Sequence, residues 1–331
     1  MLFNILMFNH GDRYAAFERM EPLIRYVQEV LSSLGHEVIL GYNEVYPGAI
    51  QLFFEYFPSH IQLGPGNYIS WRKVFESLKH QHKVKFGVVA TELIVDGVIP
   101  YPMHAPYKSN IDEKMKDRIA GFGLAGEYAD FMWCFLERTA TFHADKIRGT
   151  KFLPVGSMGV VPKSLRKTPK DIDILFFGTA TVHRIEILKR IREAGLQVTT
   201  LGTGWREGGY SAPGFLRSMI DRAKIVLNLT LGKYGDLSTQ IDPRFASCMR
   251  ITEILSRGGL IVSETIPLDN PYKPYMCSAE IAELPALCKS ILVSGSWGEL
   301  SHKFSTAFNA EMDAVRLCKP IVDETIQALM V

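Results

Sequence analysis

A histidine and an arginine stand where a helix is expected to begin, after a short apolar run. The run Ile172–Phe177 is branched and aromatic, Gly178 ends it, and His183 and Arg184 open the next helical segment. The N-terminus of a helix presents unpaired N–H groups and the positive end of its dipole, so cations there are unfavourable unless an anion binds. We therefore predict an anion site with Thr179 in its turn. The alternative is a solvated first turn that happens to be basic.

The elements around this pair predict a strand, a turn, a helix and a second strand. Apolar residues recur at helical spacing from Ile185 to Ile191, Gly195 stops the helix, and Val198–Leu201 forms the next strand. The same alternation occurs elsewhere, with strands predicted at 3–8, 36–40, 49–57, 83–91, 129–137, 150–156, 224–230 and 260–264. Strands that alternate with helices predict parallel sheets covered by helices on both faces. Pro320 predicts a break or kink in the last helix.

A chain of 331 residues is long enough for two domains of ordinary size. We predict an α/β fold with two Rossmann-like, doubly wound domains whose sheets face a cleft. The expected parts are an N-terminal domain at 1–160, a linker at 161–172, a second domain at 173–300, and C-terminal helices at 301–331 that pack back on the first domain. Glycosyl transfer, nicotinamide-dependent oxidoreduction, hinge-type ligand binding and a catalytically silent scaffold all share this plan.

The composition narrows the class of protein. The chain is 47% hydrophobic, and its 37 basic and 35 acidic residues leave a net charge of +2, which argues against a general nucleic-acid binder. The five cysteines are isolated, without metal-ligand spacing. The first apolar run is too short for a signal peptide, and no stretch is long enough to span a membrane. We expect a cytoplasmic protein and leave peripheral contact at the inner membrane face open.

Three motifs of the second half occur in a recognisable order. They are "DILFFGTATVHR", then "LGTGW" with "DRAKIVLNLT", then "RITEILSRGGLIVSE". Together they resemble the C-terminal domain of GT-B glycosyltransferases, and the likeness is greatest to the spore-maturation (CgeB-like) group. The resemblance covers roughly 171–270, whereas 1–160 is similar in architecture alone. It implies a glycosyltransferase that binds a nucleotide-sugar donor on the second domain and an acceptor on the first.

The resemblance also implies roles for two residues of the last motif. Glu253 matches a carboxylate that accepts hydrogen bonds from the ribose hydroxyls, a task that suits an ionised acceptor. Arg250 lies on the same helical face and is expected to meet a phosphate. The alternative is a surface Arg–Glu pair. Retaining relatives carry a further glutamate eight positions before the ribose-binding one, and this chain has Phe245 there. Asp242 and Arg244 lie nearby but do not occupy that position. The donor sugar and the stereochemistry of transfer therefore stay open.

We expect no cofactor and no metal site, with the nucleotide-diphosphate sugar as co-substrate. The letters "DID" at 171–173 precede a strand, at the wrong edge of the sheet for a metal. In a metal-independent transferase, helix N-termini and cationic side chains stabilise the leaving diphosphate instead. Lys233 and Tyr234 belong either to a loop over the donor or to an ordinary exposed loop.

Loops after the strands of the first half offer candidates for a catalytic base. Asp12 and His10 rank first because Gly11 permits a tight turn after the first strand, and Glu92 follows another strand. The structural alternative is a capping aspartate and a structural histidine. Further candidates follow a later strand: Glu137, Arg138 and His143. The acceptor is a glycan, a lipid-linked molecule or a protein.

The competing classes lack their own motifs. "NHGDRY" does not contain the glycines of a dinucleotide-binding turn, and the acid expected after the second strand is represented by Glu44 alone. The glycines of "VGSMG" are displaced from those of a serine-hydrolase elbow. A periplasmic-type binding protein would need an export signal. A non-catalytic GT-B-like scaffold that binds nucleotide or glycan remains the main alternative.

Overall fold

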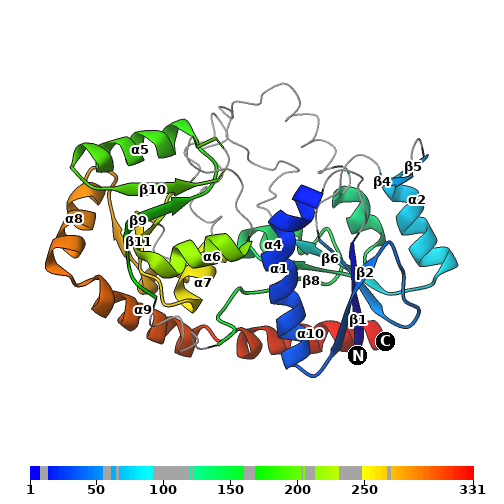
Figure 1. The fold of residues 1–331 in the computed structure, drawn as a ribbon. Helices are drawn as coiled ribbons and strands as arrows, with labels where there is room; N and C mark the ends of the chain where they lie inside the picture. The colour runs from blue at the N-terminus through cyan, green and yellow to red at the C-terminus, as the bar shows by residue number, and fades with distance from the viewer. Residues whose placement is uncertain are drawn as a thin grey trace. The chain divides into compact units, whose positions relative to one another are not determined.

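The structure is a computed structural model, shown in Figure 1. It describes residues 1–7, 14–54, 61–64, 67–91, 120, 122–159, 168–202, 204–205, 213–230, 248–266 and 270–331. These residues form two compact units. Unit 1 comprises the described residues up to Pro154 together with Ala314–Val331, and unit 2 comprises those from Val155 to Asp313.

Unit 1 is built around a parallel sheet in the order β2-β1-β3-β6-β7-β8. Helices α1 and α10 pack against each other, and α2 belongs to a core that includes Trp71, Phe75 and Phe86. Residues 122–128 are also helical. The elements are β1 (Leu2–Met7), α1 (Tyr14–Ser33), β2 (Glu37–Tyr42), β3 (Ile50–Phe54), the antiparallel pair β4 (Ile61–Gly64) and β5 (Asn67–Ile69), α2 (Trp71–Glu76), the π-helical η1 (Ser77–Gln81), β6 (Phe86–Ala90), β7 (Phe131–Cys134), α4 (Glu137–His143), β8 (Thr150–Phe152) and α10 (Ala314–Met330).

Unit 2 contains a second parallel sheet, in the order β10-β9-β11-β12-β13. Its strands β11 and β12 are buried along almost their whole length, as expected for a sheet covered on both faces. The elements are β9 (Ile172–Phe177), α5 (Val182–Glu193), β10 (Val198–Leu201), α6 (Pro213–Arg222), β11 (Ala223–Asn228), α7 (Cys248–Ser256), β12 (Ile261–Glu264), the short 3-10 helix η6 (Lys273–Tyr275), β13 (Cys277–Ala279), α8 (Leu284–Ser294) and α9 (Trp297–Glu311).

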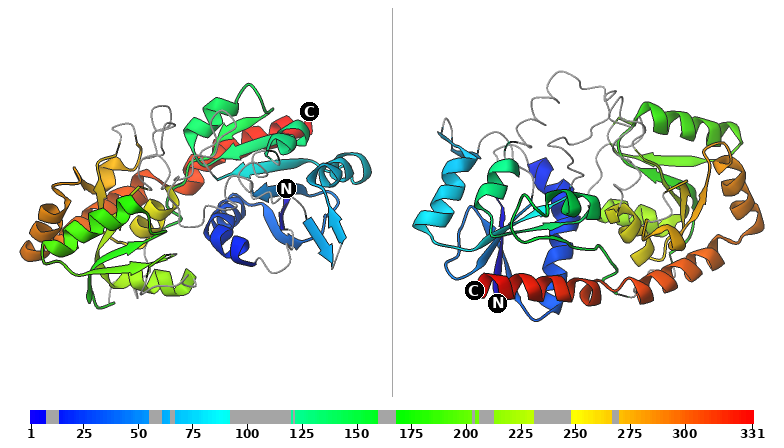
Figure 2. Two further views of the ribbon diagram at one scale, coloured as in Figure 1. Left: turned by 90° about the horizontal axis from the view of Figure 1, so that it is seen from above. Right: turned by 180° about the vertical axis from the view of Figure 1, so that it is seen from behind.

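The strand orders confirm the predicted doubly wound α/β class for both units. In unit 2 the chain moves from β9 outward to β10 and then back across β9 to β11, so right-handed crossovers put α5 on one face and α6 and α7 on the other. Figure 2 shows helices on both faces of this sheet. The strand order therefore reverses between β9 and β11, and ligands of open α/β sheets bind at the carboxyl ends of strands at such a point.

Within the described residues, the two units meet along the chain at Pro154–Val155 and at Asp313–Ala314. The linker predicted at 161–172 stays a prediction, because residues 161–167 lie outside the described residues. Both residues at the first boundary are hydrogen-bonded within their own unit. In unit 1, Tyr26 Oη donates to the Pro154 carbonyl at 2.8 Å, and in unit 2 Tyr272 Oη donates to the Val155 carbonyl at 2.8 Å. Strand β9, the first strand of unit 2, begins at Ile172, well after this boundary.

The two C-terminal helices belong to different units. Helix α9 belongs to unit 2, and α10 belongs to unit 1, where Trp133 Nε1 donates to Thr325 Oγ1 at 3.0 Å. The predicted packing of 301–331 on the first domain therefore corresponds to α10 alone. The helix runs through Pro320 without a break, so of the two predicted outcomes the break is not found and the kink stays a prediction. Cys318, Val322 and Thr325 are buried on both sides of the proline.

Candidate functional site

The turn after β9 begins at Gly178, whose φ of +142° strongly favours glycine. A Cβ atom at this position would lie 2.9 Å from Arg250 Nη2 and 3.3 Å from Arg184 Nη1. On the other side, Trp205 Nε1 donates to the Gly178 carbonyl at 2.7 Å. The glycine thus lets two guanidinium groups approach the backbone of the turn while an indole fixes its carbonyl.

Helix α5 begins immediately after this turn. Thr181 is its N-cap: the residue is extended, and its Oγ1 accepts a hydrogen bond from Arg184 N at 3.3 Å. His183 and Arg184 lie in the first turn, as predicted, and the helix N-terminus is at the carboxyl end of β9. The local sequence therefore forms the expected anion-favouring helix end.

Arg184 is 3% exposed, and its guanidinium group joins the turn after β9 to the end of β11. Nε donates to the Thr230 carbonyl and Nη2 to the Leu229 carbonyl, both at 2.9 Å, while Nη1 donates to the Thr179 carbonyl at 2.9 Å. These bonds support a positioning role. Contact between Arg184 and a phosphate stays a prediction.

Arg250 approaches the same place from α7 and is half-buried. Its Nη1 donates to the Leu229 carbonyl at 3.2 Å, and its guanidinium carbon lies 5.3 Å from the ring centre of Phe177. Burial lowers the pKa of Arg250 to about 10, against an opposing effect of Glu264, so the group is cationic at neutral pH. Its Nε is enclosed and has no hydrogen-bond partner among the described residues. An enclosed donor of this kind suits an anionic ligand.

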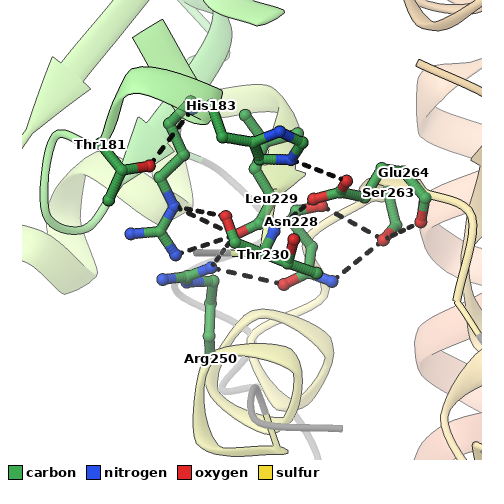
Figure 3. Close-up of polar contacts among 9 residues, drawn as sticks. Thr181, His183, Asn228, Leu229, Thr230, Arg250, Ser263 and Glu264 are labelled. Atoms are coloured by element: carbon green, nitrogen blue, oxygen red, sulfur yellow. Dashed lines mark hydrogen bonds and ion pairs between the residues drawn. The ribbon is translucent and has the colours of Figure 1, made fainter. Parts of the chain in front are cut away.

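His183 pairs with Glu264, the last residue of β12 (Figure 3). Its Nε2 lies 3.0 Å from Oε2 of Glu264, and the other carboxylate oxygen accepts a hydrogen bond from the Thr230 N–H. Burial alone would raise the pKa of the Glu264 carboxyl, but the hydrogen bonds from His183 and Thr230 outweigh it, so the pKa is lowered. Glu264 is therefore an ionised, buried carboxylate that links the end of β12 to the first turn of α5 and to the residues that follow β11.

The cluster formed by His183, Arg184, Arg250 and Glu264 is rich in positive charge. Glu264 supplies its carboxylate, which pairs with His183. The cluster lies at the carboxyl ends of β9, β11 and β12, next to the helix N-terminus of α5 and at the strand reversal of the sheet. This arrangement can bind an anion and stabilise negative charge that develops on a leaving group.

Glu253, the predicted ribose ligand, lies on α7 and is half-buried. Its Oε1 accepts a hydrogen bond from Arg217 Nε of α6 at 3.0 Å. The alternative pairing of Arg250 with Glu253 is not found among the described contacts, since Arg250 turns toward β11. One helical turn further along, Arg257 and Asp221 form a second ion pair between the chain around α7 and α6. Two ion pairs therefore link α6 to α7 and to the residue that follows it, and Glu253 belongs to the pair with Arg217.

The carboxylates of the "DID" stretch are paired with cations in the structure. Asp171 and Asp173 lie at the amino end of β9, as predicted, where they pair with Arg222 at 2.5 Å and with Lys224 at 2.6 Å. Within the described ranges no group of His, Cys, Asp and Glu could hold a metal ion.

Several predicted residues lie outside the described residues: His10, Asp12, Glu92, Lys233, Tyr234, Asp242, Arg244 and Phe245. Of the other candidates for a base, Glu137 and Arg138 lie in the first turn of α4. His143 is 7% exposed, and its ring lies 5.0 Å from Phe122 and 4.9 Å from Phe142, measured between ring centres. His143 is thus a core histidine. Glu44, the one candidate for a dinucleotide ribose, accepts a hydrogen bond from Tyr46 Oη at 2.7 Å.

The sequence reasoning missed Glu264, Trp205 and Arg217. Glu264 carries a recognisable signal, since a carboxylate two residues after the apolar run Leu260–Val262 is expected at the carboxyl end of a strand. Arg217 lies on the same face of α6 as Asp221, four residues later, which predicts a row of charges on that helix. The tryptophan has no such signal because its partner is a backbone carbonyl.

Comparisons with known proteins identify the fold. In sequence comparisons no family model and no curated protein matches the chain. Among solved structures, an alpha-glucosyltransferase in complex with UDP and a 13-mer DNA is similar with a TM-score of 0.60 at 9% identity, covering 99% of both chains. Anabaena HepE in complex with UDP and glucose is similar with a TM-score of 0.53 at 9% identity, covering 98% of this chain and 99% of that one.

A third structure, alpha,alpha-trehalose 6-phosphate synthase from Burkholderia multivorans, has a TM-score of 0.50 at 10% identity and covers 97% of this chain and 78% of that one. These neighbours are GT-B glycosyltransferases, so the predicted GT-B fold class is confirmed. The likeness to the spore-maturation group stays a prediction. None of the described helices is long and apolar enough to cross a membrane.

Proposed function

We propose that this protein is a glycosyltransferase that moves a sugar from a nucleoside-diphosphate sugar to an acceptor hydroxyl. The observation that carries the proposal is the cationic cluster at the strand reversal of unit 2. There, Arg250 has an enclosed Nε without a described partner, and Gly178 lets the guanidinium groups of Arg250 and Arg184 approach the backbone of the turn. The GT-B neighbours include HepE structures with UDP and with UDP-glucose, which makes UDP the first nucleotide to test.

The charges of the cluster suit the departure of a diphosphate. In the transfer, the acceptor oxygen forms a bond to the anomeric carbon, the bond between that carbon and the phosphate oxygen breaks, and the diphosphate leaves with its electron pair. Arg250 and the N-terminus of α5 would stabilise the negative charge that develops on the leaving oxygen. The acceptor proton goes to a base, for which Asp12, His10 and Glu92 are our candidates. The cations support a transfer that needs no divalent metal.

Glu253 completes the proposed donor site. Its carboxylate would accept hydrogen bonds from the ribose hydroxyls, with Oε1 already held by Arg217 at 3.0 Å. Charge-assisted hydrogen bonds are stronger than neutral ones, so this contact would contribute to affinity and select ribose over deoxyribose. The nucleotide sugar acts as co-substrate, and we propose a glycan, a lipid-linked molecule or a protein as acceptor.

Release of nucleotide from a nucleotide sugar tests the proposal directly. We expect UDP to form from UDP-glucose or another UDP-sugar when the protein is supplied with a panel of acceptors, and we expect the same rate in magnesium and in EDTA. Strict loss of turnover in EDTA would contradict metal independence. Tight UDP binding without turnover of any sugar nucleotide would favour the non-catalytic scaffold.

A further inference from the structure

Glu264 is a buried charge that the roles proposed above do not use. It is 6% exposed, and both of its carboxylate oxygens have partners. One oxygen lies 3.0 Å from His183 Nε2, and the other accepts a hydrogen bond from the Thr230 N–H. A buried carboxylate carries a large desolvation cost, so its retention calls for a reason beyond packing.

The contacts of Glu264 continue into the cationic cluster (Figure 3). The Thr230 N–H donates to Glu264, and the Thr230 carbonyl accepts a hydrogen bond from Arg184 Nε at 2.9 Å. The preceding carbonyl, that of Leu229, accepts from Arg184 Nη2 at 2.9 Å and from Arg250 Nη1 at 3.2 Å. Glu264 therefore anchors the backbone segment that both arginines use as their acceptor.

The same segment reaches the turn after β9. Arg184 Nη1 donates to the Thr179 carbonyl at 2.9 Å, next to Gly178. A continuous path of hydrogen bonds thus runs from Glu264 through Thr230 and Arg184 to the turn where the two guanidinium groups meet the backbone. The neighbouring strand ends are tied as well, since Asn228 Nδ2 donates to Ser263 Oγ at 3.0 Å.

We propose that Glu264 is a positioning residue for the diphosphate: it holds the segment Leu229–Thr230 and His183 so that Arg184 and Arg250 keep their places around Gly178. This inference rests on the proposed function, because it assumes that the cluster receives the diphosphate of the donor. Its effect comes from the geometry of its hydrogen bonds. Its negative charge, taken alone, opposes the binding of an anion.

Two substitutions separate geometry from charge. Glu264→Gln and Glu264→Ala both remove the charge, but the glutamine can still bind both partners. The Thr230 N–H can only donate, so the amide oxygen must face it, and the amide nitrogen then faces His183. His183 must accept through Nε2 in this variant and carry its proton on Nδ1, whereas in the wild-type protein Nε2 is the donor. Asp221→Asn is a matched control, since Asp221 is 7% exposed and pairs with Arg257.

The measurement is the preference of each variant for UDP over UMP, from calorimetric dissociation constants. A loss of overall stability weakens both ligands alike, whereas loosening of the diphosphate contacts weakens UDP selectively. We expect the preference to fall about 10-fold in Glu264→Ala, to stay within about 3-fold of wild type in Glu264→Gln, and to be unchanged in Asp221→Asn. Histidine ¹⁵N spectra at a pH where the imidazole is neutral should show the exchange of tautomer in Glu264→Gln.

The outcomes distinguish the two levels of the proposal. Equal preferences in the Ala and Gln variants, or a wild-type preference retained in Glu264→Ala, would overturn the positioning role. If Glu264→Ala does not fold, an unchanged Nε2–H tautomer of His183 in Glu264→Gln would overturn it instead. Absence of any preference for UDP over UMP in the wild-type protein would contradict the proposed function itself.

Discussion

The two ends of strand β9 carry charged side chains that are paired in different ways. At the amino end, Asp171 accepts hydrogen bonds from Arg222, and Asp173 accepts one from Lys224, so each carboxylate has its own cation. At the carboxyl end, Arg250 bonds to a backbone carbonyl and keeps an enclosed Nε without a described partner. At the carboxyl end, the guanidinium groups of Arg184 and Arg250 share one carboxylate among the described residues, that of Glu264, so the charges there are not matched one to one. We therefore propose that the diphosphate of the donor binds at the carboxyl end.

Substitution of Arg250, at the carboxyl end of β9, should lower the affinity for UDP most. Arg250→Ala removes a cation that is proposed to contact the diphosphate, and hydrogen bonds to charged groups contribute about 1.5–3 kcal/mol each. UDP affinity should therefore fall about 10- to 150-fold. Arg222→Ala breaks a matched pair at the amino end and should leave the affinity unchanged. Calorimetry with UDP on both variants measures this difference. Equal losses of UDP affinity in Arg250→Ala and Arg222→Ala would mean that the charge pairing does not indicate where the nucleotide binds.

Glu253→Gln should have the next largest effect. The amide keeps the size of the side chain but weakens its charge-assisted hydrogen bonds to the ribose, so UDP affinity should fall about 10-fold. Binding of 2′-deoxy-UDP should change less, because it lacks one of those hydroxyls. Asp221→Asn alters the neighbouring ion pair between the same helices and serves as the control. An unchanged ratio between UDP and 2′-deoxy-UDP in a folded Glu253→Gln variant would remove Glu253 from the ribose site.

Gly178→Ala should weaken binding through the backbone. The φ of +142° strains any other residue, and the new Cβ would meet Arg250 Nη2 at 2.9 Å. We expect a loss of about 1–3 kcal/mol in the free energy of unfolding and a several-fold weaker affinity for UDP. Gly195→Ala is the matched control, since Gly195 also has a positive φ of +82° but no atom within 4 Å of its Cβ position. The control should lose stability and keep its affinity, and a loss of affinity in both would point to general destabilisation.

The smallest expected effect concerns pH. The pKa of Glu264 is lowered in the folded protein, so its contribution to stability is present above its ordinary value of about 4.5 and is lost as the pH falls toward the folded pKa. Thermal unfolding should therefore show a steeper loss of stability below about pH 4.5 in the wild-type protein than in Glu264→Gln. Parallel curves for the two proteins would contradict the assignment of an ionised, hydrogen-bonded Glu264.

Much of the fold of unit 2 could be predicted from its sequence, because its strands are short apolar runs that end at glycines or polar residues. The predicted strand Val198–Leu201 matches β10, and the predicted run Ile172–Phe177 matches β9. Strands β4, β5 and β13 were missed because their sequences, IQLG, NYI and CSA, contain no run of apolar or β-branched residues that would indicate a strand. The unbroken helix through Pro320 shows tertiary packing overriding a local preference.

The candidate site could be predicted in part for the same physical reason. Gly178, His183 and Arg184 follow a strand directly, so their place at its carboxyl end is encoded locally. Arg184 donates to the backbone carbonyls of Leu229 and Thr230, 45 and 46 residues further along the chain. Because every residue has a backbone carbonyl, the sequence does not indicate which one accepts. Glu264 was missed because its role depends on His183, 81 residues away. The local sequence thus predicts at which end of a strand a residue lies, whereas its hydrogen-bond partners depend on segments that are distant along the chain.

The affinity of the wild-type protein for uridine, UMP and UDP, measured by calorimetry at low and at moderate salt, shows whether the cluster binds a diphosphate. An unmatched cationic site at the carboxyl ends of β9 and β11 predicts that affinity rises with each phosphate, by about tenfold or more for the second one, and that this gain shrinks as salt screens the charges. Equal affinity for uridine and UDP, or no binding of UDP in any salt, would contradict the account.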